Sequence, residues 1–494
     1  MTQSRQWGWA FSAVLFSLFG WAYPVGHAAQ VEAYFMPQQG EIGFATMYQA
    51  IANARTEVLI TVYSWSDKDL DRAITAARAR GAVVRLVLHP ELTSKKSLID
   101  RCVELEKIGA EFKVAPRNMH EKFVVIDGVT LVNSSANFSI GARTKYSENI
   151  IIIRDAPARL AQKMRDEFAL LWDASRDLIT AGEGLSTWMG ARAPRPMENP
   201  AEAIQFYSSS FNLDIIPTRE GTEARAMGKA VSLRLKKSAN PADQGGAPWV
   251  IRDLMIQAID SAQVSVEGAL NHFNIREIAD ALLRASRRGV AVRLAVDQQE
   301  YQDQLTPESI EMTPYFVAEW KKKNPGLTPP VRVKTYSLEP TPAFWLLNHH
   351  KMILVDYQPG ADVLPTTRLI NGSYNLSKTA EHSQFDNVLV FQGAESLPVF
   401  EAFYGEMEHL WKWGRTASDR MDPVWFERWT TPAADGTLAL HFTEAQSLTW
   451  EEMEQLLARV RLVAPGLLED LNRTNAACTR YQVTRKQLLG CPER

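Results

Sequence analysis

The sequence has few cysteines and almost no net charge. Its 494 residues include three cysteines, Cys102, Cys478 and Cys491, and none of the paired clusters that a zinc site needs. The 54 basic residues nearly balance the 57 acidic ones, so a net charge of −3 gives no general attraction to nucleic acid or acidic membranes. These shortages argue against a zinc-stabilised protein and against a non-specific nucleic-acid coat.

Long apolar runs are also scarce, and only the N-terminus has one. The run extends roughly from Trp7 to Val25 after a single charge at Arg5, and small residues follow it up to Ala29. We expect a secretory signal peptide over residues 1–29, with an uncleaved membrane anchor as the open alternative. Either one predicts a periplasmic or secreted protein, where Cys478 and Cys491 are free to form a disulfide in the C-terminal tail.

The chain contains an internal duplication. Residues 49–88 and 257–296 align without a gap, and both begin with Gln-Ala-Ile. Each copy has an apolar run, a helical pattern of period 3.6, a glycine and a second apolar run, which predicts a strand, a helix and a parallel strand. The repeat is too long for a solenoid unit, so it indicates two homologous α/β domains.

Composition changes set the expected domain boundaries. The Gly/Pro-rich stretch before Ile204 is typical of a linker, and a separate helical pattern follows Met421. We therefore predict a first lobe over residues 31–180, a linker over 181–203, a second lobe over 204–420 and a mainly helical extension over 421–494.

Each half of the chain holds the same set of polar residues. The spacing within the His-x-Lys-x4-Asp block is identical in the two copies, and so is the spacing from Ser through Asn to a later carboxylate. Nine extra residues separate the two blocks in the second copy, in a Pro/Gly-rich hairpin. The two sets are His120, Lys122, Asp127, Ser135, Asn137 and Glu148, and His349, Lys351, Asp356, Ser373, Asn375 and Asp386.

The spacing has a physical interpretation. Four apolar residues follow each lysine, so His-x-Lys begins a buried strand on which positions i and i+2 share a face. An imidazole, an ammonium, an amide and a hydroxyl at one strand end suit a phosphate, because the cation and neutral donors bind its oxygens. Two matched copies are difficult to explain as packing alone.

The doubled motif resembles that of the phospholipase D superfamily, over nearly all of residues 31–411. The first half is most similar to the secreted endonuclease and cardiolipin-hydrolase branch. The resemblance implies an α/β fold of two homologous α/β/α lobes with mixed sheets, and one active site between them. It also implies attack on a phosphodiester through a phosphohistidine, without a metal ion or any other cofactor.

The resemblance also implies roles for the residues of both sets. His120 and His349 would be nucleophile and general acid, and Glu148 and Asp386 would hydrogen-bond the imidazoles. Phosphoryl oxygens would be bound by Lys122, Lys351, Asn137 and Asn375, assisted by Ser135 and Ser373. Structural support behind the site is expected from Asp127 and Asp356.

Two residues depart from the family pattern. Ser134 stands where glycine is usual, and Asp386 stands where glutamate is common. We expect the shorter Asp386 to alter the support of His349, and we therefore choose His120 as the nucleophile. His350 is expected on the opposite strand face from His349.

These expectations favour hydrolysis of phospholipid head groups by a monomer whose two lobes form a pseudo-dimer, acting at a membrane surface. Three alternatives stay open: a nuclease with nucleic acid as substrate, a phosphatidyl transferase, and a membrane-binding module whose site has decayed. The two intact motifs argue against the last of these.

Overall fold

The molecule is described by a computed structural model. It covers residues 29–144, 146–178, 199, 201–218, 228–297, 312–334, 336–338, 347–413, 415–417 and 440–442. The expected signal peptide, most of the linker and the cysteines of the tail lie outside these residues. So does most of the expected helical extension, of which residues 440–442 are described and form strand β22 (Leu440–Phe442).

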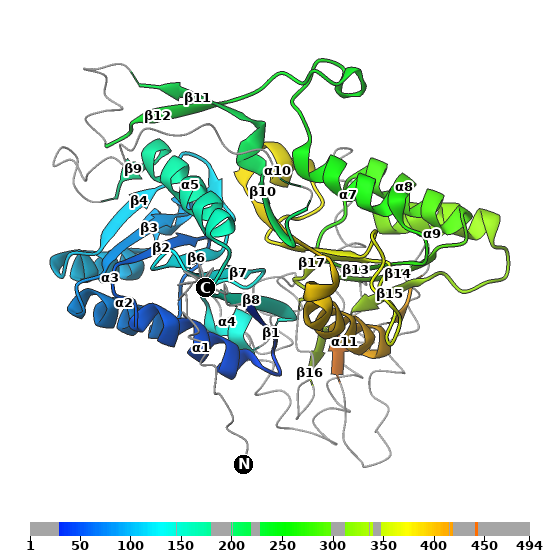
Figure 1. Ribbon diagram of the computed structural model, residues 1–494, viewed down its shortest axis with the longest axis horizontal. Coiled ribbons are helices and arrows are strands. Elements are labelled where there is room, and N and C mark those ends of the chain that lie inside the picture. Colours follow the sequence, from blue (N-terminus) through cyan, green and yellow to red (C-terminus); the bar gives the residue numbers. More distant parts are fainter. Residues whose placement is uncertain are drawn as a thin grey trace, which may run out of the picture.

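Two mixed eight-stranded sheets with the same topology form the centres of two lobes, side by side in Figure 1. The strand order is β1-β8-β7-β6-β2-β3-β4-β9 in the first lobe and β10-β20-β18-β17-β13-β14-β15-β21 in the second. In each sheet three consecutive strands are parallel and the other pairs are antiparallel. The duplication and the fold class predicted from sequence are both confirmed.

The elements of the first lobe follow the predicted order of strands and helices. They are β1 (Gln30–Met36), α1 (Gly40–Ala52), β2 (Glu57–Val62), α2 (Asp69–Ala79), β3 (Val83–Leu88), α3 (Lys96–Lys107), β4 (Glu111–Val114), β5 (Asn118–Met119), β6 (Phe123–Ile126), β7 (Thr130–Ser134), α4 (Ile140–Thr144), β8 (Glu148–Arg154), α5 (Ala158–Ala174) and β9 (Arg176–Asp177).

The second lobe repeats this order and adds two small sheets. Its elements are β10 (Ile204–Ser208), β11 (Leu213–Pro217), β12 (Val231–Leu235), α7 (Val250–Ser261), β13 (Ser265–Leu270), α8 (Arg276–Arg287), β14 (Ala291–Asp297), α9 (Met312–Lys323), β15 (Val331–Lys334), β16 (Tyr336–Leu338), β17 (Lys351–Val355), β18 (Arg368–Gly372), α10 (Lys378–His382), β19 (Gln384–Phe385), β20 (Asn387–Gln392), α11 (Leu397–Trp413) and β21 (Arg415–Thr416).

Helices cover both faces of each sheet, which explains why the central strands are continuous apolar runs rather than alternating ones. The outer faces pack on α1, α2 and α3 in the first lobe and on α7, α8 and α9 in the second, each with its own hydrophobic core. Trp65 and Phe273, which follow equivalent strands, are both buried in these cores. No helix among the described residues is long and apolar enough to span a bilayer.

The third hydrophobic core lies between the lobes and joins them. It contains residues of both sheets and of the two long helices α5 and α11. Each of these helices also contacts the edge strand of the other lobe, α5 on β10 and α11 on β1, where the rings of Phe35 and Phe403 meet edge to face at 5.0 Å. Burial of this shared apolar surface fixes the lobes relative to each other.

Two backbone contacts cross from lobe to lobe beside the polar motifs. Strand β5 pairs in parallel with β19, so that the amide of His120 donates to the carbonyl of Phe385 at 2.9 Å. At the equivalent place in the other half, the amide of His349 donates to the carbonyl of Ser147 at 2.8 Å. The chain entering each motif strand is therefore held by the other lobe.

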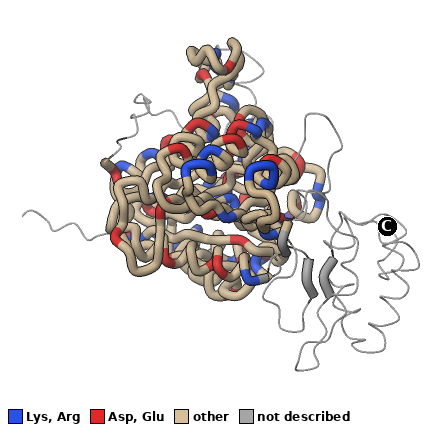
Figure 2. Tube along the Cα trace, turned by 90° about the vertical axis from the view of Figure 1, so that its right-hand side faces the viewer, with Lys and Arg blue, Asp and Glu red and all other residues tan. Residues whose placement is uncertain are grey.

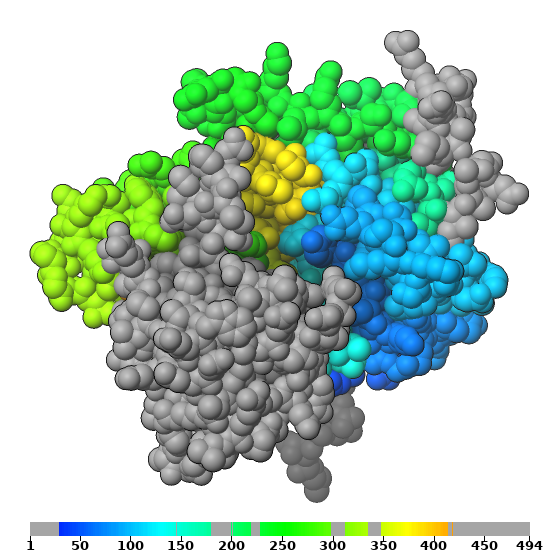
Figure 3. All heavy atoms as spheres, turned by 180° about the vertical axis from the view of Figure 1, so that it is seen from behind, coloured from blue at the N-terminus to red at the C-terminus, as the bar shows by residue number. Residues whose placement is uncertain are grey.

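An excursion between β10 and α7 has no counterpart in the first lobe. Its hairpin, β11 with β12, reaches across to α5, where Val231 packs against Leu170 and Ala174. Figure 3 shows this green segment lying across the top of both lobes. Figure 2 shows acidic and basic residues interspersed over the described chain, with no face of one sign in that view.

Candidate active site

The two His-x-Lys motifs lie at the entrances of β6 and β17, where the sheets of the two lobes meet. His120, Lys122 and Lys351 are buried, and His349 is only slightly exposed. The imidazole rings of His120 and His349 lie 6.4 Å apart between centroids and nearly perpendicular. The structure therefore brings the two motifs into one site, as the resemblance implied.

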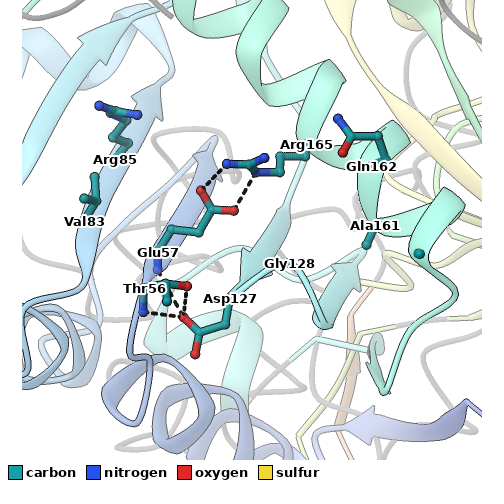
Figure 4. Close-up of a pocket in the computed structure, with 10 residues that line it drawn as sticks. Thr56, Glu57, Val83, Arg85, Asp127, Gly128, Ala161, Gln162 and Arg165 are labelled. Atoms are coloured by element: carbon teal, nitrogen blue, oxygen red, sulfur yellow. Dashed lines mark hydrogen bonds and ion pairs between the residues drawn. The ribbon is translucent and has the colours of Figure 1, made fainter. Parts of the chain in front are cut away.

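Asp127 and Asp356 anchor the far ends of the same strands. Asp127 has a φ of 52° and accepts hydrogen bonds from the backbone amides of Arg55, Thr56 and Glu57 at 2.7–3.1 Å. Figure 4 shows Asp127 beside Thr56 and Glu57. Burial opposes ionisation of Asp127, but these hydrogen bonds outweigh it and lower the pKa of its carboxyl group.

Asp356, with a φ of 53°, accepts from the amides of Gln263, Val264 and Ser265 in the same way. A side chain that satisfies three successive amides and tolerates the left-handed conformation explains why aspartate ends both motifs. These contacts place both aspartates behind the site, at the far ends of the two motif strands.

Each imidazole is hydrogen-bonded by a carboxylate of the other lobe. Nδ1 of His120 lies 2.7 Å from Oδ1 of Asp386, and Nδ1 of His349 lies 2.9 Å from Oε2 of Glu148. Because a carboxylate only accepts, Nδ1 carries the proton and Nε2 of each ring is left for chemistry. The prediction that Asp386 supports His349 is wrong, because the inter-lobe pairing places each carboxylate beside the opposite motif.

Ser135 and Ser373 do not take the positions expected of phosphate donors. The hydroxyl of Ser135 donates to Glu148 at 2.7 Å, and that of Ser373 donates to Asp386 at 2.8 Å. Each hydroxyl has one proton, which is thereby committed to the carboxylate that holds an imidazole. The serines therefore position the carboxylates.

The glycine of the usual pattern is needed in only one lobe. A Cβ atom at Gly372 would lie 2.2 Å from the carbonyl oxygen of Asn387. In the first lobe Ser134 occupies the equivalent position, and its hydroxyl donates to the carbonyl of Asn149 at 2.8 Å. The departure at Ser134 is thus accommodated without loss of a site residue.

The lysines and asparagines are the donors available to a ligand. Nζ of Lys351 donates to the carbonyl of His349 at 2.7 Å, and Lys122 makes the equivalent bond to His120, so each ammonium keeps further protons for a ligand. The side chains of Asn137 and Asn375 have no hydrogen-bond partner among the described residues, and each carbonyl oxygen is buried. The side-chain amides of both asparagines therefore keep their N–H protons for a ligand.

Burial and mutual repulsion shift the charges of the site. Burial, reinforced by Lys122, lowers the pKa of His120 to about 4, and burial with Lys351 and Lys122 lowers that of His349 as well. Burial also lowers the pKa of Lys122 to about 8 and that of Lys351 to about 7, although Asp386 and Glu148 oppose these shifts. Both imidazoles are therefore neutral at pH 7, and the concentrated positive charge favours an anion.

Residues next to the histidines break the symmetry of the site, and sequence reasoning missed them. The ring of Tyr63, at the end of β2, lies 4.8 Å from the His120 ring and 5.0 Å from Nζ of Lys122. The equivalent Asn271 is buried, and its neighbour His272 lowers the pKa of His349. The sequence could have indicated Tyr63 and Asn271, because they occupy matching positions after equivalent strands of the repeat.

His350 lies behind the site rather than in it, as expected from strand alternation. Its ring is fully buried and lies 2.9 Å from the amide nitrogen of Asn149 and 3.1 Å from Oε1 of Glu406. Asn149 also exchanges two hydrogen bonds with Asn371 across the lobe boundary. This network holds the lobes together behind the catalytic pair.

The comparison with protein families identifies this arrangement. The family described as "Cardiolipin synthase, PLD-like domain" matches residues 47–172 and 255–411, which include both motifs and more than half of the chain. The chain belongs to the phospholipase D superfamily. Its site is accordingly that of a phospholipase D-like enzyme.

Curated relatives resemble one lobe of this phospholipase D-like chain. It is 30% identical over 143 residues to the mitochondrial cardiolipin hydrolase of Danio rerio, covering 28% of this chain and 61% of the relative. It is 29% identical over 129 residues to a phospholipase D of Rickettsia prowazekii, covering 26% and 61%. The chain thus spans about three fifths of the length of these relatives.

Two solved structures are similar to parts of this chain. The phospholipase D family member Nuc of Salmonella typhimurium is 26% identical, with a TM-score of 0.28, covering 30% of this chain and 98% of Nuc. Phosphatidylserine synthase of Haemophilus influenzae is 14% identical, with a TM-score of 0.49, covering 78% and 87%.

Proposed function

We propose that the chain is an exported phosphodiesterase that hydrolyses phospholipid head-group phosphodiester bonds through a phosphohistidine intermediate. The observation that carries this proposal is the pair of imidazoles from different lobes, 6.4 Å apart between ring centroids and each bonded through Nδ1 to a carboxylate. Nε2 of each ring has no hydrogen-bond partner among the described residues. A substrate held between Lys122 and Lys351 has one imidazole on each side.

The geometry suits a two-step displacement. Nε2 of one histidine attacks phosphorus, the bond to the head-group oxygen breaks, and the second histidine gives that oxygen a proton. A water molecule then attacks phosphorus and loses its proton to the second histidine, and the phosphorus–nitrogen bond breaks to free the first histidine. The anionic substrate offsets the positive field of the lysines, and this allows one imidazole to hold the proton that the leaving group needs.

The lipid substrate is supported by the names of the relatives, a cardiolipin hydrolase and a phospholipase D. The family description, cardiolipin synthase, specifically favours a second candidate, a phosphatidyl transferase in which an alcohol replaces water. A metal-independent endonuclease would use the same residues. Because one chain supplies both motifs, we propose an active monomer at a membrane surface.

One assay separates these functions. The purified mature protein is incubated with labelled phospholipid, with and without a primary alcohol, and with plasmid DNA, in EDTA throughout; the His349→Ala variant is the inactive control. We expect phosphatidic acid and free head group from lipid, and intact plasmid. A phosphatidyl-alcohol product formed in preference to phosphatidic acid would make the enzyme a transferase, and nicked plasmid with intact lipid would make it a nuclease.

Export is tested separately by determining the N-terminus of the protein recovered from its native host. We expect a chain that begins near residue 29 and is recovered outside the cytoplasm. Recovery of an unprocessed, soluble cytoplasmic chain would contradict the export proposal.

A further inference from the structure

A cavity in the second lobe lies away from the catalytic pair. It has a volume of about 570 Å³ and opens at the edge of the sheet, between β10, β18, β20 and the face of α7. Arg368 begins β18 and Gln392 ends β20, whereas Gly372 and Asn387 at the opposite strand ends adjoin the catalytic residues. The cavity is therefore at the far end of these strands from the active site.

The side chain of Arg368 borders this cavity and forms no ion pair within the described part of the chain. It also forms no hydrogen bond with any described side chain, and its Nε is buried without a partner. Glu395 also borders the cavity, but it does not pair with Arg368. A half-buried arginine without a carboxylate is costly unless an anion accompanies it.

At the equivalent place in the first lobe, an arginine is neutralised by a glutamate. There Glu32 of β1 accepts from Tyr34 at 2.7 Å and from Nε of Arg154 at 2.9 Å. The strand registers make Glu32 equivalent to Gln205. Glu32 lies opposite Ile152 of β8, and Gln205 lies opposite Val390, which is the counterpart of Ile152 in β20.

The same registers make Arg154 equivalent to Gln392 and Thr130 equivalent to Arg368. Tyr207 donates to Gln205 at 3.1 Å, just as Tyr34 donates to Glu32. The second lobe has therefore kept the tyrosine, replaced the glutamate by an amide, and moved the arginine one strand inward. The ion pair of the first lobe has become a single positive charge facing a cavity.

The other residues that line the cavity indicate which chemical group would accompany the anion. Apolar side chains come from α7, β20 and the nine-residue insertion that only the second lobe has. They are Leu254, Val390, Val363, Leu364 and Pro365. The exposed Gln257 adds an amide on the α7 side. One cation beside an apolar wall suits a molecule with an anionic head and a short apolar chain.

We propose that this cavity is a binding site for an amphiphilic anion, a carboxylate or phosphate monoester on a short apolar chain, whose head is bound by Arg368. The site is distinct from the catalytic pocket and does not depend on the proposed reaction. The insertion, which the sequence showed only as an extra hairpin, supplies part of its wall.

Calorimetric titration of the full chain tests the site with four probes: octanoate, octyl phosphate, inorganic phosphate and octanol. Octanoate is expected to bind at one site, and octyl phosphate to bind there in addition to the catalytic pocket. Inorganic phosphate and octanol should bind this site about tenfold more weakly or not at all, because each lacks one half of the ligand. Octanol binding as tightly as octanoate, or no octanoate binding by the folded wild type, would overturn the proposal.

Variants locate the binding. Arg368→Gln should weaken octanoate binding by about tenfold or more, whereas Arg154→Gln in the first lobe and Lys351→Met in the catalytic site should change it by less than about twofold. Gln392→Glu keeps Arg368 and places a carboxylate directly opposite it, because the two residues pair between β18 and β20. This carboxylate should pair with Arg368 and abolish octanoate binding. This variant decides the matter if Arg368→Gln does not fold, and octanoate binding that survives it unchanged overturns the proposal.

Discussion

His120 of the first lobe and Asp386 of the second are joined by a hydrogen bond of 2.7 Å. The reciprocal bond joins His349 to Glu148, so neither lobe holds a complete catalytic unit. The pairing follows from the backbone contacts between β5 and β19 and between Ser147 and Asn348, which place each carboxylate opposite the other lobe's histidine.

Asp386→Asn should disturb His120 and leave His349 nearly unchanged. An amide cannot hold the Nδ1–H tautomer as a carboxylate does, so we expect turnover to fall by about 100-fold or more. Imidazole resonances of the two histidines, followed by NMR, provide the measurement. Glu148→Gln is the matched variant and should shift His349 alone; a shift of His349 in Asp386→Asn would contradict the crossed pairing.

Replacement of either histidine by alanine should remove nearly all activity. Because the proposed mechanism uses both imidazoles in one reaction, His120→Ala and His349→Ala should each lower turnover by at least ~10³-fold. His409→Ala is the control, because the ring of His409 bonds to Gln38 away from the two motifs. Two half-active single variants would mean two independent sites.

Activity should fall as the pH rises above neutrality. The pKa of Lys351 lies at about 7 and that of Lys122 at about 8, so the free enzyme loses first one and then the other ammonium over this range. In the proposed mechanism the protonated lysines bind the phosphoryl oxygens, so kcat/KM should decline through pH 7–8. Lys351→Arg, which keeps its charge, should move the decline to higher pH, and an unchanged profile would count against this assignment.

Asp127→Ala should destabilise the protein without changing the chemistry of the folded fraction. The substitution leaves three backbone amides without their acceptor, which should cost about 2–4 kcal/mol in the free energy of unfolding. Asp155 has a similar φ of 49° and is exposed, so Asp155→Ala controls for backbone conformation alone. Equal losses in the two variants, measured by chemical denaturation, would show that the clamp contributes nothing.

A rapid acid-free quench with labelled phospholipid should trap label on a single histidine, because phosphorus bonded to nitrogen is acid-labile and relatively base-stable. The sequence favoured His120 because Glu148 was expected to support it. The crossed pairing gives Glu148 to His349, so the same argument now predicts label on the peptide that contains His349. Label on the His120 peptide would reverse the assignment, and the absence of any adduct would favour direct attack by water.

The sequence by itself determined the duplication, the buried motif strands and the residues that meet at the site. Those features are local: apolar runs set the strands, alternation places His and Lys on one face, and a side chain that tolerates positive φ explains Asp127 and Asp356. Spacing within a repeat cannot tell whether Glu148 contacts the histidine of its own copy or of the other, because both arrangements have the same local pattern.

Only the tertiary structure decided what depends on contacts between distant segments. Contacts between the lobes, at β5 with β19 and at Ser147 with Asn348, placed each carboxylate beside the histidine of the other lobe. Strand register, likewise, set Arg368 beside a cavity while its counterpart Thr130 has no charge. Charge balance at such places is a property of neighbours in space, which the order of residues along the chain does not specify.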